Sequence, residues 1–197
     1  MDQDSEPVNK RIAASVRTLR SQRGLTLDEL AAASGVSRSA LSLIERAESS
    51  PTAVVLDRIA AGLGVTLASL FGELPDRTAG PLVRHAEQPV WRDPSSGYVR
   101  RSVSPGTDVS PIQIVEVTFP AHARVAFETG ARGRSAEQQL WVLEGTIDFS
   151  IGEDSYRLRA GDCLAARLDR PTMFRNPTSK TARYAVVVST DAGRGRR

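Results

Sequence analysis

The sequence predicts an α+β protein of two domains: a helical N-terminal domain at residues 1–71 and an antiparallel β-barrel at residues 82–190. Apolar residues in the first part recur at helical spacing, whereas the later apolar segments are short and separated by Gly, Pro, Asp and Ser. Between the two, residues 72–81 read GELPDRTAGP, and their prolines and glycines indicate a linker. Residues 191–197 form a basic tail, which we expect to be solvated.

Composition indicates the cellular compartment in which the protein is expected. No apolar run reaches the ~18 residues that suggest a membrane-spanning helix. The polar N-terminus lacks the apolar segment of a secretory signal. Cys163 is the only cysteine, which excludes an intramolecular disulfide. We therefore expect a cytoplasmic protein in which Cys163 is a buried, unreactive thiol.

Five helices are predicted in the first domain. An apolar face over residues 9–23 predicts the first. The second begins after Thr26, whose spacing to Glu29 is that of a capping box, and ends at Gly35, which allows a left-handed turn. Ser37 then caps a third helix. Two further helices are expected at residues 51–63 and 67–71.

These helices resemble those of the XRE family of helix-turn-helix regulators over residues 9–71. The resemblance rests above all on Thr26 to Ala31, Gly35-Val36-Ser37 and Leu41 to Glu45. It implies that the helix after Ser37 enters the major groove of double-stranded DNA, with its first side chains facing base edges. It also implies that Glu45 pairs with Arg20 or Arg23. The predicted DNA-binding residues are Thr26, Ser37, Arg38, Ser39 and Ser42.

Basic charge is local in this domain. Residues 9–46 contain seven Lys or Arg and three Asp or Glu, although the net charge of the whole chain is only +3. This favours a domain that touches a few phosphates and reads bases over one that coats DNA. Arg38 suits either a bidentate contact to guanine or a phosphate, and the sequence leaves both open. Thr26 begins a helix, and helix N-termini attract phosphate.

About ten short strands are predicted after residue 82, which is typical of an antiparallel barrel or sandwich. Two turns narrow the choice, VLEG at residues 142–145 and AGD at residues 160–162. They give residues 112–189 a resemblance to the cupin family. Gly145 and Gly161 are expected at positive φ in these turns.

The metal ligands of cupins are replaced in this chain. By the resemblance, two histidine positions fall near Ala131 and Gly133, the glutamate position falls on Gln138, and the third histidine position falls on Thr172. His122 has no second histidine at ligand spacing. We therefore expect no metal, no cofactor and no enzymatic activity.

We expect the mouth of the barrel to bind a small-molecule effector instead. Gln138 and Thr172 replace ligands and should point inward. Glu128 lies between apolar neighbours and would need a partner, for which the candidates are Arg132, Arg134 and Arg175. The expected effector-binding residues are Glu128, Gln138, Thr172, Phe174 and Asn176. Trp141 alternates out of phase with Gln138 and should face another surface, such as a second copy of the chain.

The favoured hypothesis is a sequence-specific transcriptional regulator, a homodimer whose metal-free barrel senses an effector. An alternative is a cupin enzyme of the mononuclear-iron epoxidase or oxygenase type with an accessory helix-turn-helix domain. A third is a barrel that only dimerises and has no saturable ligand. Metal analysis of the purified protein separates the first two.

Overall fold

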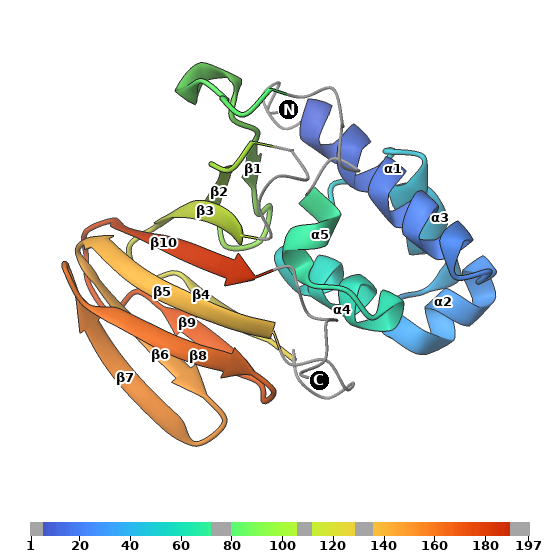
Figure 1. Cartoon of the computed structure of the whole chain (residues 1–197). Coiled ribbons are helices and arrows are strands. Elements are labelled where there is room, and N and C mark those ends of the chain that lie inside the picture. The colour runs from blue at the N-terminus through green and yellow to red at the C-terminus, as the bar shows by residue number, and fades with distance from the viewer. Residues whose placement is uncertain (1–5, 72–79, 106–111, 129–135, 190–197) are drawn as a thin grey trace, which may run out of the picture.

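Helices lie on one side of the computed structural model and a two-sheet sandwich lies on the other (Figure 1). The structure describes residues 6–71, 80–105, 112–128 and 136–189. The predicted linker lies outside these ranges except for residues 80 and 81, and the predicted basic tail lies outside them entirely.

The N-terminal domain contains the five predicted helices. They are α1 (Glu6–Gln22), α2 (Leu27–Ser34), α3 (Arg38–Glu45), α4 (Ala53–Leu63) and α5 (Leu67–Phe71). Thr26 and Glu29 form the predicted capping box, and Gly35 has the predicted left-handed conformation with φ 69°. The first helix begins earlier than predicted because its apolar face continues back to Val8, which is buried. No helix in the described ranges is long and apolar enough to cross a membrane.

Ten strands in the described residues form two antiparallel sheets. They are β1 (Val90–Arg92), β2 (Val99–Ser102), β3 (Ile112–Phe119), β4 (Arg124–Phe127), β5 (Ala136–Glu144), β6 (Thr146–Ile151), β7 (Asp154–Arg159), β8 (Cys163–Leu168), β9 (Thr172–Arg175) and β10 (Ala182–Ser189). A short 3-10 helix, His85–Glu87, precedes them. The six-stranded sheet has the order β1-β2-β3-β10-β5-β8, and the four-stranded sheet has the order β4-β9-β6-β7.

The predicted antiparallel β-domain is confirmed, and of the two forms left open, barrel or sandwich, the described residues form the sandwich, because no strand pairing joins the two sheets. The architecture is a sandwich of two antiparallel sheets. The chain leaves β5 of one sheet at Gly145 (φ 79°) and enters β6 of the other, so the hydrogen-bonded ladder is interrupted at this corner. A Cβ added at Gly145 would lie 3.0 Å from that of Ala182, so the corner leaves no room for a side chain.

Aromatic rings hold the two sheets together. Phe174 of β9 stacks on Tyr184 of β10, with ring centroids 5.8 Å apart and planes 9° from parallel. Phe149 of β6 contacts the same Phe174 at 4.9 Å. All three are buried, and such large side chains contribute strongly to core stability.

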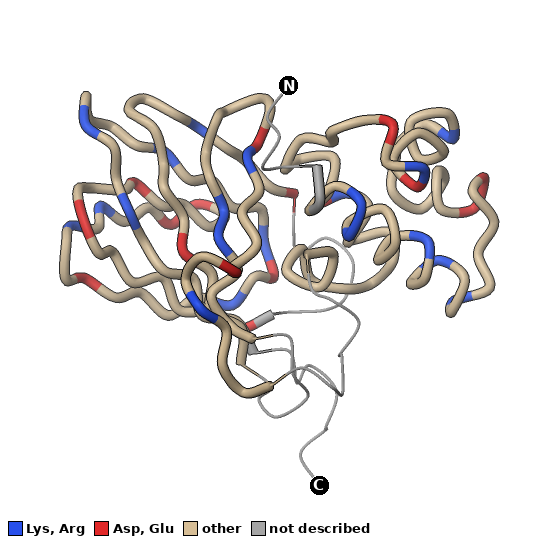
Figure 2. The backbone as a smooth tube through the Cα atoms, turned by 90° about the horizontal axis from the view of Figure 1, so that it is seen from above, with Lys and Arg blue, Asp and Glu red and all other residues tan. Residues whose placement is uncertain are grey.

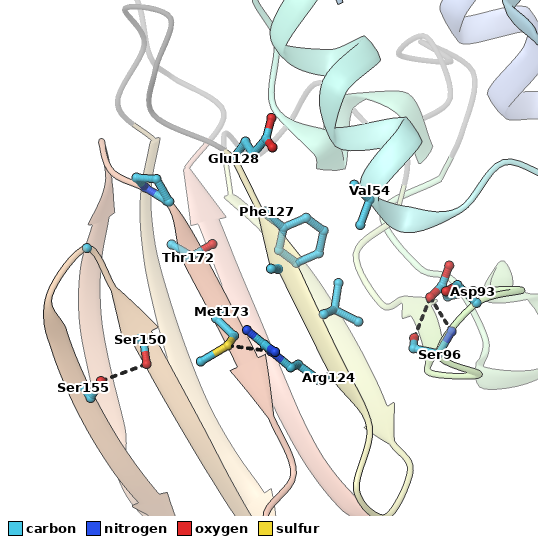
Figure 3. Close-up of a pocket in the computed structure, with 15 residues that line it drawn as sticks. Val54, Asp93, Ser96, Arg124, Phe127, Glu128, Ser150, Ser155, Thr172 and Met173 are labelled. Atoms are coloured by element: carbon cyan, nitrogen blue, oxygen red, sulfur yellow. Dashed lines mark hydrogen bonds between the residues drawn. The ribbon is translucent and has the colours of Figure 1, made fainter. Parts of the chain in front are cut away.

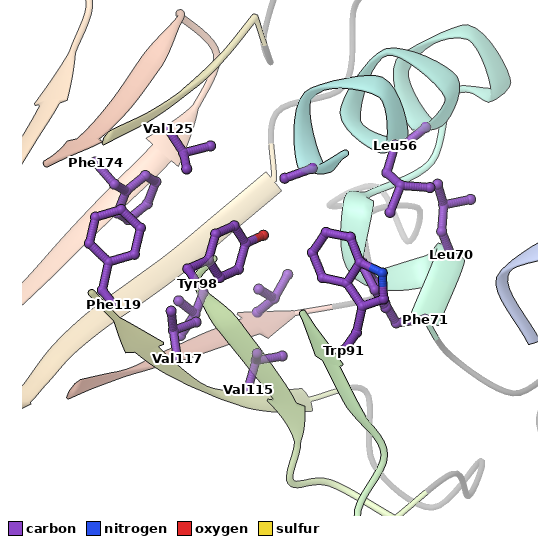
Figure 4. Close-up of a cluster of buried hydrophobic side chains, with 14 of the residues drawn as sticks. Leu56, Leu70, Phe71, Trp91, Tyr98, Val115, Val117, Phe119, Val125 and Phe174 are labelled. Atoms are coloured by element: carbon purple, nitrogen blue, oxygen red, sulfur yellow. The ribbon is translucent and has the colours of Figure 1, made fainter. Parts of the chain in front are cut away.

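The core of the sandwich continues into the helical domain (Figure 4). Phe71 of α5 packs edge-on against Trp91 of β1, with centroids 5.2 Å apart, and Trp91 contacts Tyr98 at 5.8 Å. The guanidinium of Arg100, on β2, lies 4.6 Å from the centre of the Phe71 ring. Because these side chains are buried, the two domains share one continuous apolar core rather than only a tether.

Candidate functional site

The N-terminal end of α3 presents a small polar surface. Ser37 caps the helix, since its Oγ accepts a hydrogen bond from the backbone N–H of Ala40 at 3.2 Å. The Oγ atoms of Ser37 and Ser39 are 3.2 Å apart. Ser37, Arg38 and Ser39 are exposed, and Ser42, about one turn later, is half-buried. The structure thus brings these four predicted residues together at one end of one helix.

Two of these side chains have partners within the protein. Nε of Arg38 lies 3.2 Å from Oδ1 of Asp28 on α2, and the two side chains are 65% and 76% exposed. Oγ of Ser42 accepts a hydrogen bond from Nη1 of Arg46 at 2.8 Å. An ion pair as exposed as that of Arg38 is worth roughly 0–1 kcal/mol. A base or phosphate can therefore replace Asp28 at little cost.

Thr26, the fifth predicted DNA-binding residue, is exposed but already engaged. Its hydroxyl donates to Oε2 of Glu29 at 2.8 Å and accepts from the Glu29 backbone N–H at 3.2 Å. Backbone and hydroxyl donors of Thr26 hold the pKa of Glu29 below its ordinary value. The start of α2 therefore carries a carboxylate, which opposes a close phosphate contact there.

The inner face of α3 is anchored by an ion pair. Nε and Nη2 of Arg20 donate to the two carboxylate oxygens of Glu45 at 2.7 and 2.9 Å. The predicted pairing of Glu45 is confirmed, with Arg20 as the partner. Glu45 is buried, and the hydrogen bonds to it raise the pKa of Arg20. This pair joins α1 to the end of α3 and fixes how the helix is presented.

In the sandwich, Gln138 and Thr172 are buried as expected, with 7% and 4% of their surfaces exposed. Gln138 lies on β5 between Val188 and Ala166 of the neighbouring strands. Its Nε2 atom is buried and has no hydrogen-bond partner in the described residues. An unsatisfied buried donor costs about 1–3 kcal/mol, so this amide is a candidate for contacting a ligand.

Phe174 and Asn176 are buried for structural reasons. Phe174 fills the aromatic core described above. Nδ2 of Asn176 donates to the carbonyl oxygens of Phe119, Pro120 and Lys180, and its Oδ1 accepts from Thr178. Asn176 was predicted to bind the effector. Because its amide is fully used in holding these turns together, that prediction is corrected to a structural role.

Glu128, which was expected to bind the effector in the mouth of the barrel, does not point into the sandwich. Its carboxylate is 72% exposed and lies 3.4 Å from Nη2 of Arg58 on α4. It follows β4 at the edge facing the helical domain, so its partner comes from a helix. Of the partners predicted from sequence, Arg132 and Arg134 lie outside the described residues.

The described residues contain no group of three or more His, Cys, Asp or Glu placed to hold a metal. Ala131 and Gly133 lie outside those residues. Cys163 is exposed, contrary to prediction, because it pairs with Trp141 on the outer face of the six-stranded sheet.

Comparisons with known proteins agree with this geometry. The HTH_3 helix-turn-helix family model matches residues 16–70. The uncharacterized HTH-type transcriptional regulator y4dJ of Sinorhizobium fredii is 36% identical over 63 residues, which cover 32% of this chain and 82% of y4dJ. The chain belongs to the XRE-type helix-turn-helix family of transcriptional regulators.

The likeness of this regulator to known proteins extends over both domains. The Escherichia coli K12 HTH-type transcriptional regulator SutR is 26% identical over 190 residues, covering 90% of this chain and 93% of SutR. The crystal structure of an HTH_3 family transcriptional regulator from Vibrio cholerae superposes with a TM-score of 0.71 at 26% identity, covering 92% of this chain and 96% of that one. The chain is therefore a DNA-binding transcriptional regulator whose likeness to these relatives includes its second, all-β domain.

Sequence reasoning missed two buried carboxylates where the domains meet. Asp93, just after β1, accepts a hydrogen bond from the first backbone N–H of α4. Asp57 of α4 is 1% exposed, and its Oδ1 has no partner in the described residues. Burial raises the pKa of Asp57 to about 7, which the backbone N–H of Glu128 partly opposes. An acidic residue among the apolar positions of α4 was the one available signal.

Proposed function

We propose that this regulator reads its operator through the N-terminal end of α3, and that an effector bound inside the sandwich changes operator affinity. The observation that carries the sensing half of this proposal is the buried, unpartnered Nε2 of Gln138. The observation that supports the reading half is the exposure of Ser37, Arg38 and Ser39 at the start of α3.

Operator recognition would combine the long, positively charged side chain of Arg38 with short serine side chains. The guanidinium of Arg38 suits a guanine edge or a phosphate, and short serine side chains allow the backbone of α3 to approach the groove. Lys and Arg positions are interspersed with Asp and Glu positions in both domains (Figure 2). This mixed charge favours a few directed contacts over broad coating of DNA.

Effector sensing would use Gln138 and Thr172. An effector with a hydrogen-bond acceptor would satisfy Nε2 of Gln138, which no protein group in the described residues does. Thr172 pairs with Phe127 across the β4–β9 ladder, one residue before Glu128. A ligand that shifts Thr172 would therefore act on the strand end that contacts the helical domain.

Helix α4 would carry the signal between the domains. Arg58 and Asp57, at the middle of α4, meet Glu128 of the sandwich. On the other side, Gly62 of α4 lies so close to Ser34 of α2 that an added Cβ would come within 2.9 Å of the Ser34 Cβ. A movement of α4 would therefore be transmitted directly to the helix-turn-helix pair.

A homodimer is part of this proposal, because helix-turn-helix proteins read paired half-sites with two copies. The outer face of the six-stranded sheet exposes Ile112, Ile114 and Trp141 by 47%, 38% and 49%. Trp141→Glu should convert a dimer to a monomer in sedimentation velocity. Tyr156→Glu, at a comparably exposed aromatic residue of the four-stranded sheet, should leave the dimer intact.

We propose no catalytic role for the sandwich. The alternative, an iron enzyme, would need ligands such as two histidines and a carboxylate. The buried positions that correspond to such ligands hold Gln138 and Thr172. Stoichiometric iron, manganese or zinc in the purified protein would favour the enzyme instead.

The test of operator binding is fluorescence anisotropy with DNA from upstream of the regulator's own gene, at fixed salt and with excess competitor DNA. Competitor-resistant binding is expected. Binding that disappears with competitor would contradict sequence-specific reading of this DNA. A ligand screen scored by the change in anisotropy then tests sensing.

A further inference from the structure

A cleft of about 670 Å³ lies between the start of α4 and the outer face of the four-stranded sheet (Figure 3). Val54 of α4 and the turn at residues 93–96 form one wall, and β4, β9, β6 and β7 form the other. Clefts of about 300–1,000 Å³ are the usual size for small ligands. Gln138 does not line this cleft, whereas Thr172 does, so the cleft and the sensing position proposed above meet at Thr172.

Arg124 brings an unbalanced positive charge to the cleft. It lies directly opposite Arg175 in the β4–β9 ladder, and like charges in this position repel. Its Nε contacts Sδ of Met173 at 2.9 Å, but a thioether is a weak acceptor. In the described part of the chain no carboxylate forms an ion pair with Arg124. Its guanidinium therefore keeps donors for an anion.

The acidic residue on this face does not form an ion pair with Arg124. Asp148 of β6 is held by Nε and Nη2 of Arg157, at 2.7 and 3.1 Å. Asp148 lies opposite Arg175 in the β6–β9 ladder, and Arg175 also attracts it. Asp148 is thus paired with Arg157, and Arg124 is the arginine that lines the cleft.

The remaining lining limits which anion fits. Val54, Phe127 and Met173 supply apolar surface to the same cleft. Two carboxylates lie on the side toward the helices: Asp93, which is buried and hydrogen-bonded, and Glu128, which pairs with Arg58. A second negative charge on the ligand would be repelled by them.

We propose that this cleft binds a small monocarboxylate with an apolar body. Arg124 holds the carboxylate through charge-assisted hydrogen bonds, and the body packs between Val54 and Phe127. Because Val54 belongs to the helical domain and the rest of the lining belongs to the sandwich, the bound ligand contacts both domains. The inference stands whether or not the interior of the sandwich senses an effector.

The test is calorimetric titration of the full-length protein with phenylbutyrate, with its uncharged isostere phenylbutanol and with the dicarboxylate phenylsuccinate. Saturable millimolar binding is expected for phenylbutyrate, and at least tenfold weaker binding for the other two. Arg124→Gln should weaken phenylbutyrate binding about tenfold. Arg175→Gln changes the arginine directly opposite, which does not line the cleft, and should leave binding within about twofold.

Two further variants locate the ligand. Ser155→Trp fills the cleft from an exposed position and should abolish binding without disturbing the core. Gln138→Leu alters the interior and should leave phenylbutyrate binding unchanged. The proposal is overturned if phenylbutyrate shows no saturable binding, or if phenylbutanol binds equally well. It is also overturned if Arg175→Gln matches Arg124→Gln, or if Gln138→Leu abolishes binding.

Discussion

Asp93 of the sandwich accepts a hydrogen bond from the backbone N–H of Ala53, the first residue of α4, at 2.9 Å. Thr52 caps the same helix from its own domain by accepting from the backbone N–H of Val55. One helix is therefore capped by both domains at once. The negative charge of Asp93 also suits the positive end of the helix dipole. The cap makes α4 a shared element and not only a part of the DNA-binding domain.

Asp93→Ala should lower the free energy of unfolding by about 1–3 kcal/mol, because it leaves a buried N–H without a partner and removes a cap. Urea denaturation of the full-length protein measures this. Ser96→Ala removes only the hydroxyl that Asp93 also accepts from, so it should cost less. Equal losses in the two variants would mean that Asp93 acts through its turn and not through α4.

Asp57 should make stability depend on pH. Burial raises its pKa in the folded protein to about 7 from 3.8, with the carboxylate of Glu128 adding to the rise, and Arg58 opposing it. Between these values the folded state holds a proton that the unfolded state has lost. The contribution of Asp57 is thus fully present below about pH 4 and is lost as pH rises through about 7.

Asp57→Asn removes this titration. The variant should gain stability relative to the wild type as pH rises from about 4 to 7, by at most about 4 kcal/mol. Asp154→Asn, at an exposed aspartate paired with Arg170, serves as the control and should show a much smaller change. A constant difference between Asp57→Asn and the wild type across this range would show that Asp57 is not the titrating group.

The helical domain was predictable because its signals are local. The capping box of Thr26 and Glu29 and the left-handed Gly35 lie within nine residues of each other, and each is visible as a residue type at a fixed spacing. The pairing of Glu45 with Arg20 came from resemblance to the family, since nothing local specifies a contact across 25 residues.

The sandwich was less predictable because the sequence does not show which strands pair, and this pairing decides which face of each strand is buried. Gln138 and Thr172 were placed correctly as buried residues, but Glu128 proved exposed and Asn176 proved fully engaged in turns. The contact between the domains was missed altogether. Asp93 and Ala53 are 40 residues apart, and no local pattern predicts that one caps the other's helix.

Arg38→Ala should weaken operator binding by about 1–3 kcal/mol if the guanidinium reads a guanine. Arg167→Ala is a matched control, since Arg167 is 61% exposed in an ion pair with Glu137 and lies on the sandwich. Anisotropy with operator and with scrambled DNA distinguishes the two roles of Arg38. A base contact affects operator alone, whereas a phosphate contact affects both DNAs. Equal effects of the two alanine variants would mean that α3 is not the reading helix.

Asp28→Asn should have the opposite effect on the same measurement. It removes the acidic partner that holds Arg38 in the free protein, and it removes a negative charge beside the DNA. Operator affinity should rise, by less than about 1 kcal/mol, because the pair is exposed. A loss of affinity would show that Asp28 positions Arg38 for DNA and does not compete with it.

Gln138→Leu should raise the stability of the ligand-free protein and abolish its response to an effector. Leucine removes the buried Nε2 that has no partner in the described residues and keeps a similar volume. The ligand-free protein should therefore become more stable by about 1–2 kcal/mol in urea denaturation. The same change should abolish the effect of any ligand found to shift operator affinity, while affinity without ligand stays the same. Residues that serve binding often lower the stability of the ligand-free protein in this way.

The neighbouring variant Gln139→Leu is the control for Gln138→Leu, because Gln139 is exposed on the opposite face of β5. It should change neither stability nor ligand response by a measurable amount. If Gln138→Leu instead lowers stability, the amide of Gln138 is satisfied in solution and supports the sandwich. If stability rises but the ligand response persists, the effector binds elsewhere, and the cleft at Arg124 becomes the next position to test.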